Sequence, residues 1–421
     1  MTPVLLRLII PAYSLVLSAG MALVKACCSG TAIARNWSLS ERSSGPRPKK
    51  GKTVGATVWI HAASLGESKL LVRFLDILRK KHPGQSYLLT ATTKTGVEYL
   101  RGRDASDIAG VGFLPLDTIG LMQQLIETFG VRRVWVMETE LWPSMIWACI
   151  RNSVPLGLVN ARIEERSLSS YKRLGWLLSD LLTYPDTVLA QTAAYARRFE
   201  ILGIKKDRIH VTGNLKSFVT VHPLSSEERV QRRRALSLDD TELCLTAGCL
   251  HATEGAILLQ ALEIVRAAGL ACKCIVVPRH LREVPALVRE LGPDAVVCPE
   301  PRCEIAWNVC VIDKMGILDA MYRIADAAFV GGTFDSTGGH NMWDAAQYGI
   351  PVVFGPDIHT QEESAGSLIS AGVGFKVNDA AGLARTLIEV LGNGRQQFLR
   401  ARDEFMQRVN RRKNAFEDVI Q

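Results

Sequence analysis

Short apolar runs alternate with helix-length amphipathic segments along most of this chain, and this alternation restricts the fold more than any other feature. The first runs are TVGATVWIHA, YLLTAT, VGFLPL, VRRVWVMET, PLGLVNA and TVLAQT. Segments such as GESKLLVRFLDILRKKH and TIGLMQQLIETFG separate them. Apolar strands that alternate with helices are typical of a parallel sheet covered on both faces. The alternation therefore predicts an α/β protein with doubly wound sheets.

A polar, charged stretch at residues 217–240 interrupts this rhythm, and the alternation then restarts with ELCLTAGCL, CKCIVVPRH, NVCVIDK, DAAFVGG and PVVFGP. Because 421 residues exceed what one core usually organises, we expect two Rossmann-like domains. The expected boundaries are an N-terminal segment at 1–25, a basic neck at 26–52, a first domain at 53–216, a linker at 217–240, a second domain at 241–394 and a C-terminal helix at 395–421.

Charge is distributed unevenly along the chain. The formal net charge is +8, and residues 1–52, with eight Lys or Arg and one acid, carry +7 of it. The rest of the chain is therefore close to neutral, whereas a nucleic-acid-binding domain carries its charge on the folded face. We expect no nucleic-acid partner. The composition, 48% apolar and 22% charged, also excludes a disordered chain or a polytopic membrane protein.

An uncharged stretch of 17 residues, LIIPAYSLVLSAGMALV, lies between Arg7 and Lys25. Seventeen residues is the lower limit for a helix that crosses the hydrocarbon core. A cleaved signal peptide and a buried helix are the alternatives, but a buried helix is not normally followed by a run of cations. The excess of cations after the stretch predicts a single-pass anchor in the inner membrane, with the downstream domains on the cytoplasmic side.

The ten cysteines form no CxxC pair. Most of them lie in apolar runs, as Cys310 does in WNVCVID, and are expected to be small core residues. Neither a disulfide framework nor a metal site is predicted, and we expect no cofactor.

The loops that follow the strands carry the candidate chemistry, because ligands of doubly wound sheets bind at the carboxyl ends of the strands. Glu67 follows Ser64-Leu65-Gly66 at the start of a helix, where it is either a functional acid or an ordinary first-turn acid that complements the helix dipole. Glu138 lies in METELWP, which is either a sugar-binding or charge-positioning loop or an ordinary helix cap. Lys216, in VTGNLK, is a site residue or a solvated surface cation.

Glycine turns and one arginine follow the strands of the second half. Pro278-Arg279-His280, Asp313-Lys314-Met315-Gly316 and Gly331-Gly332-Thr333 each come directly after an apolar run, and Gly338-Gly339-His340-Asn341 follows. Backbone amides and an arginine are what a nucleotide phosphate requires. Each cluster alone is weak evidence, and neither a Walker A sequence nor a strand-linked GxGxxG is present.

Taken in order, these motifs resemble those of the Kdo transferases, which move 3-deoxy-D-manno-octulosonic acid (Kdo) from CMP-Kdo to lipid A in Gram-negative lipopolysaccharide synthesis. The resemblance begins at Trp59 and rests on WIHAASLGE, TKTG at 93–96, METELWP, VNARIEERS, VTGNLK, AGCLHATEG, VPRH, DKMG and FVGG…GGHN. It implies a GT-B fold with an amino-terminal acceptor half, a carboxy-terminal CMP-Kdo half and an interdomain cleft. It also implies an inner-membrane anchor.

The resemblance also implies roles for individual residues. The family's general base falls on Glu67, and its supporting catalytic positions fall on Glu138 and Lys216. Its CMP contacts fall on Pro278, Arg279, Met315, Gly316, Ile317, Asn341, Met342, Trp343 and Asp344.

Three positions depart from the family pattern. Ile317 and Asp344 stand where the family usually has Glu, and Cys249 stands where it has Ser. The expected activity is inverting transfer of one or more Kdo residues from CMP-Kdo to lipid A (lipid IVA). The alternatives are another GT-B sugar-nucleotide transferase or epimerase, or a non-catalytic membrane-tethered protein that binds sugar nucleotides.

Overall fold

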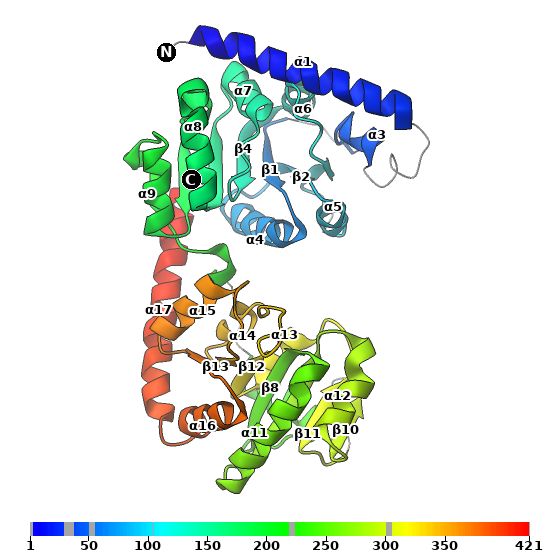
Figure 1. Ribbon diagram of the computed structural model, residues 1–421, viewed down its shortest axis with the longest axis vertical. Helices are drawn as coiled ribbons and strands as arrows, with labels where there is room; N and C mark the ends of the chain where they lie inside the picture. The colour runs from blue at the N-terminus through cyan, green and yellow to red at the C-terminus, as the bar shows by residue number, and fades with distance from the viewer. Residues whose placement is uncertain are drawn as a thin grey trace. The chain divides into compact units, whose positions relative to one another are not determined.

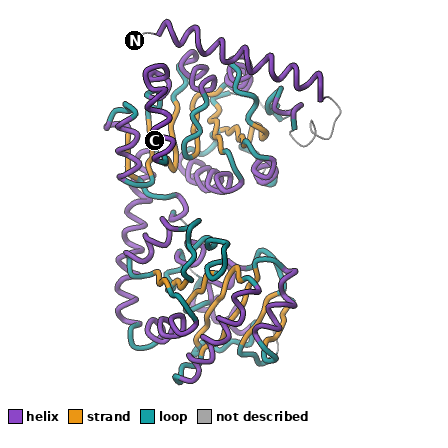
Figure 2. The backbone as a smooth tube through the Cα atoms, viewed as in Figure 1, coloured by secondary structure: helices purple, strands orange, loops and turns teal. Residues whose placement is uncertain are grey.

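The computed structural model describes residues 3–28, 38–49, 55–103, 105–218, 224–299 and 305–420. The chain forms two compact units, one from Met1–Phe218 with Arg412–Gln421 and the other from Val219–Arg411. Each unit contains a seven-stranded parallel sheet flanked by helices (Figure 1; Figure 2). The predicted α/β class with two doubly wound domains is confirmed.

The first sheet has the strand order β3-β2-β1-β4-β5-β6-β7, and all its printed pairings are parallel. This order places the ends of β1, β4 and β5 side by side. The strands are β1 (Thr57–Ala62), β2 (Ser86–Ala91), β3 (Ile108–Phe113), β4 (Val131–Met137), β5 (Leu156–Ala161), β6 (Thr187–Ala190) and β7 (Ile209–Val211).

Successive strand residues of this sheet face opposite layers, as the pleat requires. Trp59 and Ile60 are both fully buried, but they belong to different apolar clusters on the two faces. The helices of the unit are α1 (Pro3–Cys28), α3 (Leu39–Arg42), α4 (Leu65–Lys81), α5 (Lys94–Arg101), α6 (Ile119–Phe129), α7 (Pro143–Asn152), α8 (Glu165–Leu182) and α9 (Ala193–Ile201), with 3-10 turns η1 (Lys206–Arg208) and η2 (Leu215–Ser217).

The second sheet has the order β10-β11-β9-β8-β12-β13-β14. Its strands are β8 (Leu243–Leu250), β9 (Cys272–Pro278), β10 (Ala295–Cys298), β11 (Val309–Ile312), β12 (Ala327–Val330), β13 (Val352–Phe354) and β14 (Gly374–Lys376). The helices are α10 (Ser226–Ala235), α11 (Gly255–Ala267), α12 (Val284–Leu291), α13 (Leu318–Ile324), α14 (Trp343–Ala346), α15 (Glu362–Ser370), α16 (Ala380–Leu391) and the first part of α17 (Arg395–Val419), with 3-10 turns η3 (Ala252–Glu254) and η4 (Leu281–Glu283). Cys310 is fully buried in this unit, as expected of a small core residue.

The ends of the second unit differ from the expected boundaries. The expected linker at 217–240 contains α10, whose Ser225 cap and Glu228 form a capping box. Helix α17 begins in the second unit, but its last turns belong to the first. There Phe416 makes edge contacts with Phe74 and Phe218, with ring centroids 5.9 and 5.2 Å apart. The first unit is therefore discontinuous in sequence.

Helix α1 corrects the predicted membrane anchor. Within the described residues, no helix is long and apolar enough to cross a bilayer, so the expectation of a single-pass anchor was wrong. The uncharged stretch is short, and Pro11, Tyr13, Ser14, Ser18 and Gly20 lower its hydropathy. Of the expected basic neck at 26–52, residues 29–37 and 50–52 lie outside the described residues.

Part of α1 packs on its own unit, next to α6 and α7 (Figure 1). The Ile10 side chain is buried in the core, and the Ser14 hydroxyl accepts a hydrogen bond from the Ile119 amide at 3.0 Å. Other apolar side chains of the helix, Leu15 and Val16 among them, are exposed. The helix is therefore held by one face.

Candidate active site

The charged loops of the first unit meet at the carboxyl edge of its sheet. Glu67 follows β1, Glu138 and Glu140 follow β4, Arg162 follows β5 and Lys216 follows β7. The first three of these strands are neighbours, so the structure brings the sequence-predicted residues of this unit to one edge. Coulombic interactions link Glu67 to Glu140 and Arg162, and link Glu138 to Glu67 and Lys216.

Glu67 occupies the third position of α4 and closes its amino end. The Ser64 hydroxyl accepts a hydrogen bond from the Glu67 amide at 3.3 Å and donates one to Glu67 Oε1 at 3.0 Å. The Ala63 amide donates to Oε2 at 2.8 Å. Both carboxylate oxygens are thus held in place, as a capping acid requires. The same contacts fix the carboxylate at the strand edge, where it is partly exposed.

The pKa of the Glu67 carboxyl is raised, and burial is the main cause. The Glu140 charge raises this pKa further, while the hydrogen bonds from Ala63 and Ser64 and the positive charge of Arg162 oppose the rise. A carboxylate with a raised pKa is a better proton acceptor near neutral pH than an ordinary glutamate. The environment therefore suits a general base.

Glu138 follows β4 with a left-handed backbone, at φ 56°. This conformation is uncommon outside glycine, and such strain clusters at functional sites. Arg162 Nε donates to Glu138 Oε2 at 2.8 Å, and the Thr139 hydroxyl donates to the Arg162 carbonyl. Burial raises the pKa of Glu138, while Arg162 opposes the rise. The pair ties the loops after β4 and β5 together.

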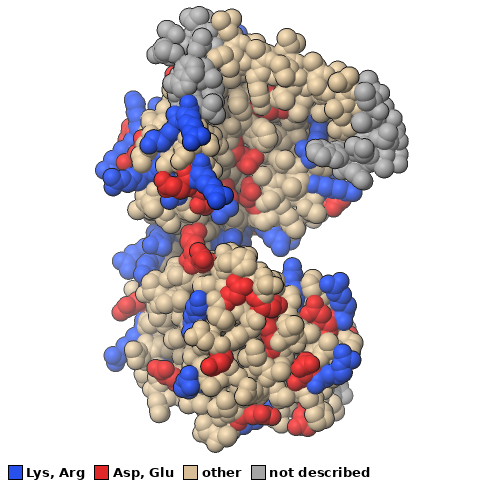
Figure 3. Space-filling model, in the orientation of Figure 1, with Lys and Arg blue, Asp and Glu red and all other residues tan. Residues whose placement is uncertain are grey.

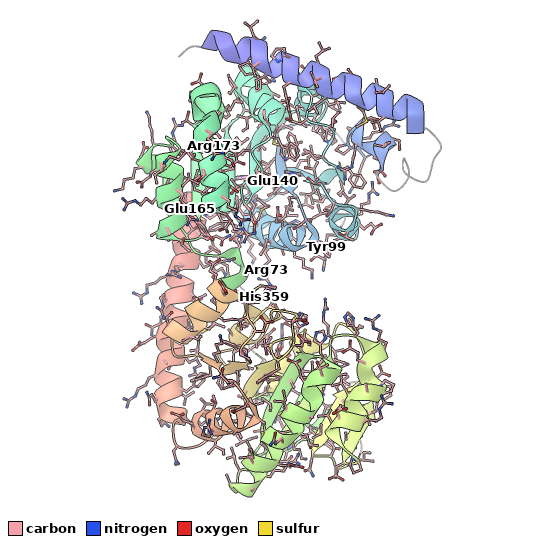
Figure 4. The ribbon with its side chains drawn as sticks, viewed as in Figure 1. Arg73, Tyr99, Glu140, Glu165, Arg173 and His359 are labelled. Carbon is pink, nitrogen blue, oxygen red and sulfur yellow. The ribbon has the colours of Figure 1, made fainter. Side chains whose placement is uncertain are left out.

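Glu140 adds a third carboxylate to this edge, and Figure 4 labels it in the loop after β4. Burial raises its pKa, and the charge of Glu138 raises it further. Like charges this close favour the protonated form of at least one partner. The cluster can therefore hold a proton that a reaction delivers to it.

Lys216 is positioned by buried amides rather than by its own contacts. Asn160, buried and left-handed at φ 55°, accepts a hydrogen bond from the Leu215 amide at 2.9 Å through its Oδ1. Gln191 Nε2 donates to the Asn160 carbonyl, and Asn214 Oδ1 accepts from the Lys216 amide. Arg73, labelled on α4 in Figure 4, donates to the Lys216 carbonyl at 3.0 Å. The end of β5, the loops after β6 and β7, and helix α4 thus fix the turn that carries the lysine.

A buried carboxylate organises the corresponding edge of the second unit. Glu254 is 1% exposed, and its oxygens accept hydrogen bonds from the amides of His251, Gly332, Thr333 and Phe334 at 2.8–3.1 Å. A side chain at Gly331 would collide with the Cys249 carbonyl and the Glu254 carboxylate. Glycine is therefore needed after β12, because the backbone there passes too close to Cys249 and Glu254 to leave room for a side chain. The hydrogen bonds to Glu254 fix the conformation of that loop.

Three histidines and the predicted arginine lie around this loop. His251 and His340 are stacked, with Nε2 atoms 2.9 Å apart, and the His280 ring lies 6.1 Å from His251. Burial, with the nearby charges of Arg279 and His251, lowers the pKa of His340 to about 4. His340 is accordingly neutral at physiological pH. The exposed Arg279 side chain supplies the permanent charge, and its amide donates to the Leu250 carbonyl.

The remaining predicted contacts divide into exposed and buried residues. Met315 and Gly316 form an exposed turn after β11, while the Ile317 side chain packs against an apolar cluster. Met342 and Trp343 are buried in the core, so only their backbones are available to a ligand. Asn341 Nδ2 donates to Asp344 Oδ1 at 2.6 Å. Gly338, at φ 82°, lies against the ring of His359, which Figure 4 labels.

No group of three or more His, Cys, Asp or Glu side chains within the described residues is arranged to hold a metal ion. The His251 and His340 rings are stacked, and the His280 ring meets His251 edge-on.

Several residues of these edges were not singled out from sequence: Asn160, Arg162, His251 and Glu254. Arg162 and Asn160 lie in VNARIEERS, and His251 and Glu254 lie in AGCLHATEG, motifs that had been identified without separating their members. The position of Glu254 three residues beyond a strand-end histidine was the available signal. Three of its four amide partners come from a loop about 80 positions further along the chain, which spacing does not reveal.

Two doubly wound units, one with an acid–base edge and one with a glycine-rich, cationic edge, define a protein of the GT-B class. A crystal structure of UDP-GlcNAc 2-epimerase from Neisseria meningitidis bound to UDP-GlcNAc has this fold, with a TM-score of 0.56 over 82% of this chain and 94% of that one. The two sequences are 14% identical, so the likeness concerns the fold alone.

Sequence comparisons narrow the class further. Residues 37–219 match the family model described as 3-deoxy-D-manno-octulosonic-acid transferase. The 3-deoxy-D-manno-octulosonic acid transferase of Chlamydia trachomatis is 30% identical over 81% of this chain and 78% of its own length. The enzyme of the same name from Aquifex aeolicus is 29% identical over 82% and 89%. The chain belongs to the Kdo transferase family, and it is a glycosyltransferase.

Proposed function

We propose that this protein transfers one or more Kdo residues from CMP-Kdo to hydroxyl groups of lipid A (lipid IVA), with inversion, in lipopolysaccharide core biosynthesis. One observation carries the proposal: a Kdo transferase family member holds Glu67, Glu138, Glu140, Arg162 and Lys216 at the carboxyl edge of one sheet. We assign acceptor binding to the first unit and CMP-Kdo binding to the second.

The proposed reaction is a single displacement. The acceptor hydroxyl oxygen bonds to the anomeric carbon of Kdo, and the bond from that carbon to the CMP phosphate oxygen breaks. CMP leaves with the electron pair, and the hydroxyl proton passes to Glu67. The raised pKa of Glu67 supports this role, because a base whose pKa lies nearer the working pH accepts a proton more effectively. Glu138 and Lys216 support the charges that develop in the transition state.

In the second unit we assign CMP binding to Pro278 and Arg279, to Met315, Gly316 and Ile317, and to Asn341, Met342, Trp343 and Asp344. The exposed guanidinium of Arg279 suits the phosphate. Ile317 has no carboxylate, and Met342 and Trp343 are buried, so these three contribute backbone groups only. Asp344 retains a carboxylate that can accept a hydrogen bond from a ribose hydroxyl, although the Asn341 amide already donates to one of its oxygens.

The test is a turnover assay with CMP-Kdo and lipid IVA, read by product mass, with UDP-GlcNAc as the competing donor. We expect mass increments of Kdo on the acceptor and no consumption of UDP-GlcNAc. Glu67→Gln protein serves as the negative control. Consumption of UDP-GlcNAc without any use of CMP-Kdo would favour a different GT-B activity. Binding of both CMP-Kdo and acceptor without turnover would favour a non-catalytic protein.

A further inference from the structure

The second unit contains a cavity of about 500 Å³ that the proposed reaction does not use. Its walls include residues 325–326, directly before β12, and residues 347–351, directly before β13. The proposed CMP contacts instead follow the strands of the same parallel sheet. The cavity therefore lies at the amino edge of the sheet, opposite the edge that carries Arg279 and Asn341. A volume of this size is in the range that holds small organic ligands.

The cavity is lined by several arginines and a single acid, Asp326. That acid is already paired: Arg229 Nη2 lies 3.1 Å from Asp326 Oδ1, and Arg233 Nη1 lies 3.4 Å from Oδ2. Arg229 therefore serves the fold. The remaining lining cations, Arg323, Arg395 and Arg402, give the cavity a net positive charge.

These three guanidinium groups retain donors for a ligand. Arg323 Nε donates hydrogen bonds to the Asp319 carboxylate and the Tyr348 hydroxyl. Its two Nη atoms form no hydrogen bond within the described residues. Arg402 pairs with its neighbour Asp403, which is 62% exposed and a weak partner for that reason. The Arg395 side chain has neither a hydrogen bond nor an ion pair within the described residues.

Arg402 is also built into the wall. Gly349 has a left-handed backbone at φ 67°, and a Cβ there would lie 3.0 Å from Arg402 Cδ. The glycine turn thus leaves room for the arginine stem to cross it. Arg323 lies over the ring of Tyr348, with 5.6 Å from its Cζ to the ring centroid. These contacts hold two of the cations in the cavity wall.

The rest of the wall is apolar. It is formed by the end of α16 and one face of α17, with Leu391, Phe398, Leu399 and Met406 among its members, and by Ile350 and Pro351. Acidic and basic side chains are intermixed over the visible face of this unit in Figure 3. That face is therefore not uniformly basic, whereas the lining of the cavity carries an excess of arginine. A wall that combines guanidinium forks with apolar side chains complements a molecule with the same two parts.

We propose that this cavity is a binding site for a small amphipathic anion, a phosphate or carboxylate attached to an apolar group. The forks of Arg323, Arg395 and Arg402 hold the anionic group, because guanidinium matches phosphate and carboxylate with paired hydrogen bonds. The α16 and α17 side chains cover the apolar group. The site is separate from the CMP site, so its occupation does not depend on the proposed reaction.

The experiment is calorimetric titration of the full chain with decyl phosphate, below its micelle concentration, and in parallel with phenyl phosphate and inorganic phosphate. We expect one saturable site for an organic phosphate and much weaker binding of inorganic phosphate, which lacks the apolar part. Tighter binding of decyl phosphate would indicate a lipid-like ligand, and tighter binding of phenyl phosphate a compact metabolite. Either result supports the proposal.

Variants locate the site. Arg402→Gln and Arg395→Gln should each weaken binding about tenfold or more, as for a lost hydrogen bond to a charged group. Leu399→Trp should weaken it by filling the apolar part. Arg400→Gln, an exposed α17 arginine outside the lining, is the matched control and should change nothing. Melting curves confirm that each variant is folded.

Three results would overturn the proposal: no saturable binding of either organic phosphate, an equal loss of affinity in Arg400→Gln and Arg402→Gln, or displacement of the bound probe by CMP. The last would place the anion at the opposite edge of the sheet. None of these readouts requires turnover, so a failure of the proposed transferase activity would leave this result interpretable.

Discussion

The two units share a fold but use the carboxyl edges of their sheets differently. The first unit collects ionisable side chains there, with Glu67, Glu138 and Glu140 beside Arg162 and Lys216. The second unit has its acid, Glu254, buried and bound to backbone amides, so that it shapes a glycine loop instead of facing a ligand. The cation of that edge, Arg279, is exposed.

This difference separates two tasks. An edge of side-chain acids with raised pKa values can accept a proton, and an edge of glycine turns with an arginine can hold an anion. Substitutions in the first unit should therefore alter turnover and its pH dependence, whereas substitutions in the second should alter nucleotide affinity.

The largest expected effect comes from Glu67→Gln, which removes the proposed base and keeps the side-chain shape. Turnover should fall by about 100-fold or more, while CMP affinity stays unchanged. Steady-state kinetics with CMP-Kdo and lipid IVA measure the first, and titration with CMP measures the second. Glu200→Gln, an exposed acid on α9, is the control. Near-normal turnover would leave Glu67 as a helix-capping acid only.

Arg279→Ala tests the anion-binding edge. CMP binding should weaken by about 1.5–3 kcal/mol, the range for a hydrogen bond to a charged group. Affinity for lipid IVA, measured separately, should not change if the two tasks are divided between the units. Arg282→Ala, an exposed neighbour on η4, provides the comparison. Unchanged CMP affinity in the Arg279 variant would refute its assignment.

Glu254→Gln tests whether the buried acid shapes the glycine loop. The amide group of Gln turns an N–H₂ toward backbone donors, so about 1–3 kcal/mol of folding stability should be lost. CMP affinity should decrease with it, although Glu254 is not proposed to touch the nucleotide. Thermal unfolding measures the stability, and titration with CMP measures the affinity. Glu263→Gln, on the exposed face of α11, is the control. A stability loss with unchanged CMP affinity would uncouple the loop from the site.

The smallest effect concerns pH. Glu67 acts ionised, so turnover is present above its pKa and is lost as pH falls through it. Arg162 holds the pKa values of both Glu67 and Glu138 down, so Arg162→Gln should move the acidic limb of the kcat profile to higher pH. Arg166→Gln, an exposed arginine on α8, should leave the profile in place. A limb that moves to lower pH would contradict the proposed electrostatics.

Much of the fold was predictable because the local pattern of apolar and polar residues indicates buried strands and amphipathic helices. The strand-end positions of Glu67, Glu138, Lys216 and Arg279 followed from the same pattern. The pairings were less predictable: Glu138 with Arg162, and Glu254 with the amides after β12, join residues that are distant in the chain. Strand order, which hydrophobic periodicity does not encode, brings them together.

Two expectations about the chain ends show the limit of local reasoning. A charge-free run between cations resembled an anchor, yet its proline, serines and tyrosine make it too polar. Ile10 and Ser14 of this run pack against the first unit. The closing charged segment was predicted as one helix, and α17 is one, but the pattern of residues 395–421 does not reveal that Phe416 and Ile420 belong to the core of the first unit.

The sequence order of the first unit has a consequence for protein synthesis. A ribosome translates Met1–Phe218, which contain the whole first sheet, well before it reaches Arg412. At ordinary elongation rates, translation of Val219–Arg411 takes roughly 10–40 s. During that time the pocket against Phe74 and Phe218 has no Phe416 to fill it. The nascent first unit therefore keeps this apolar surface uncovered until the last turns of α17 have been synthesised.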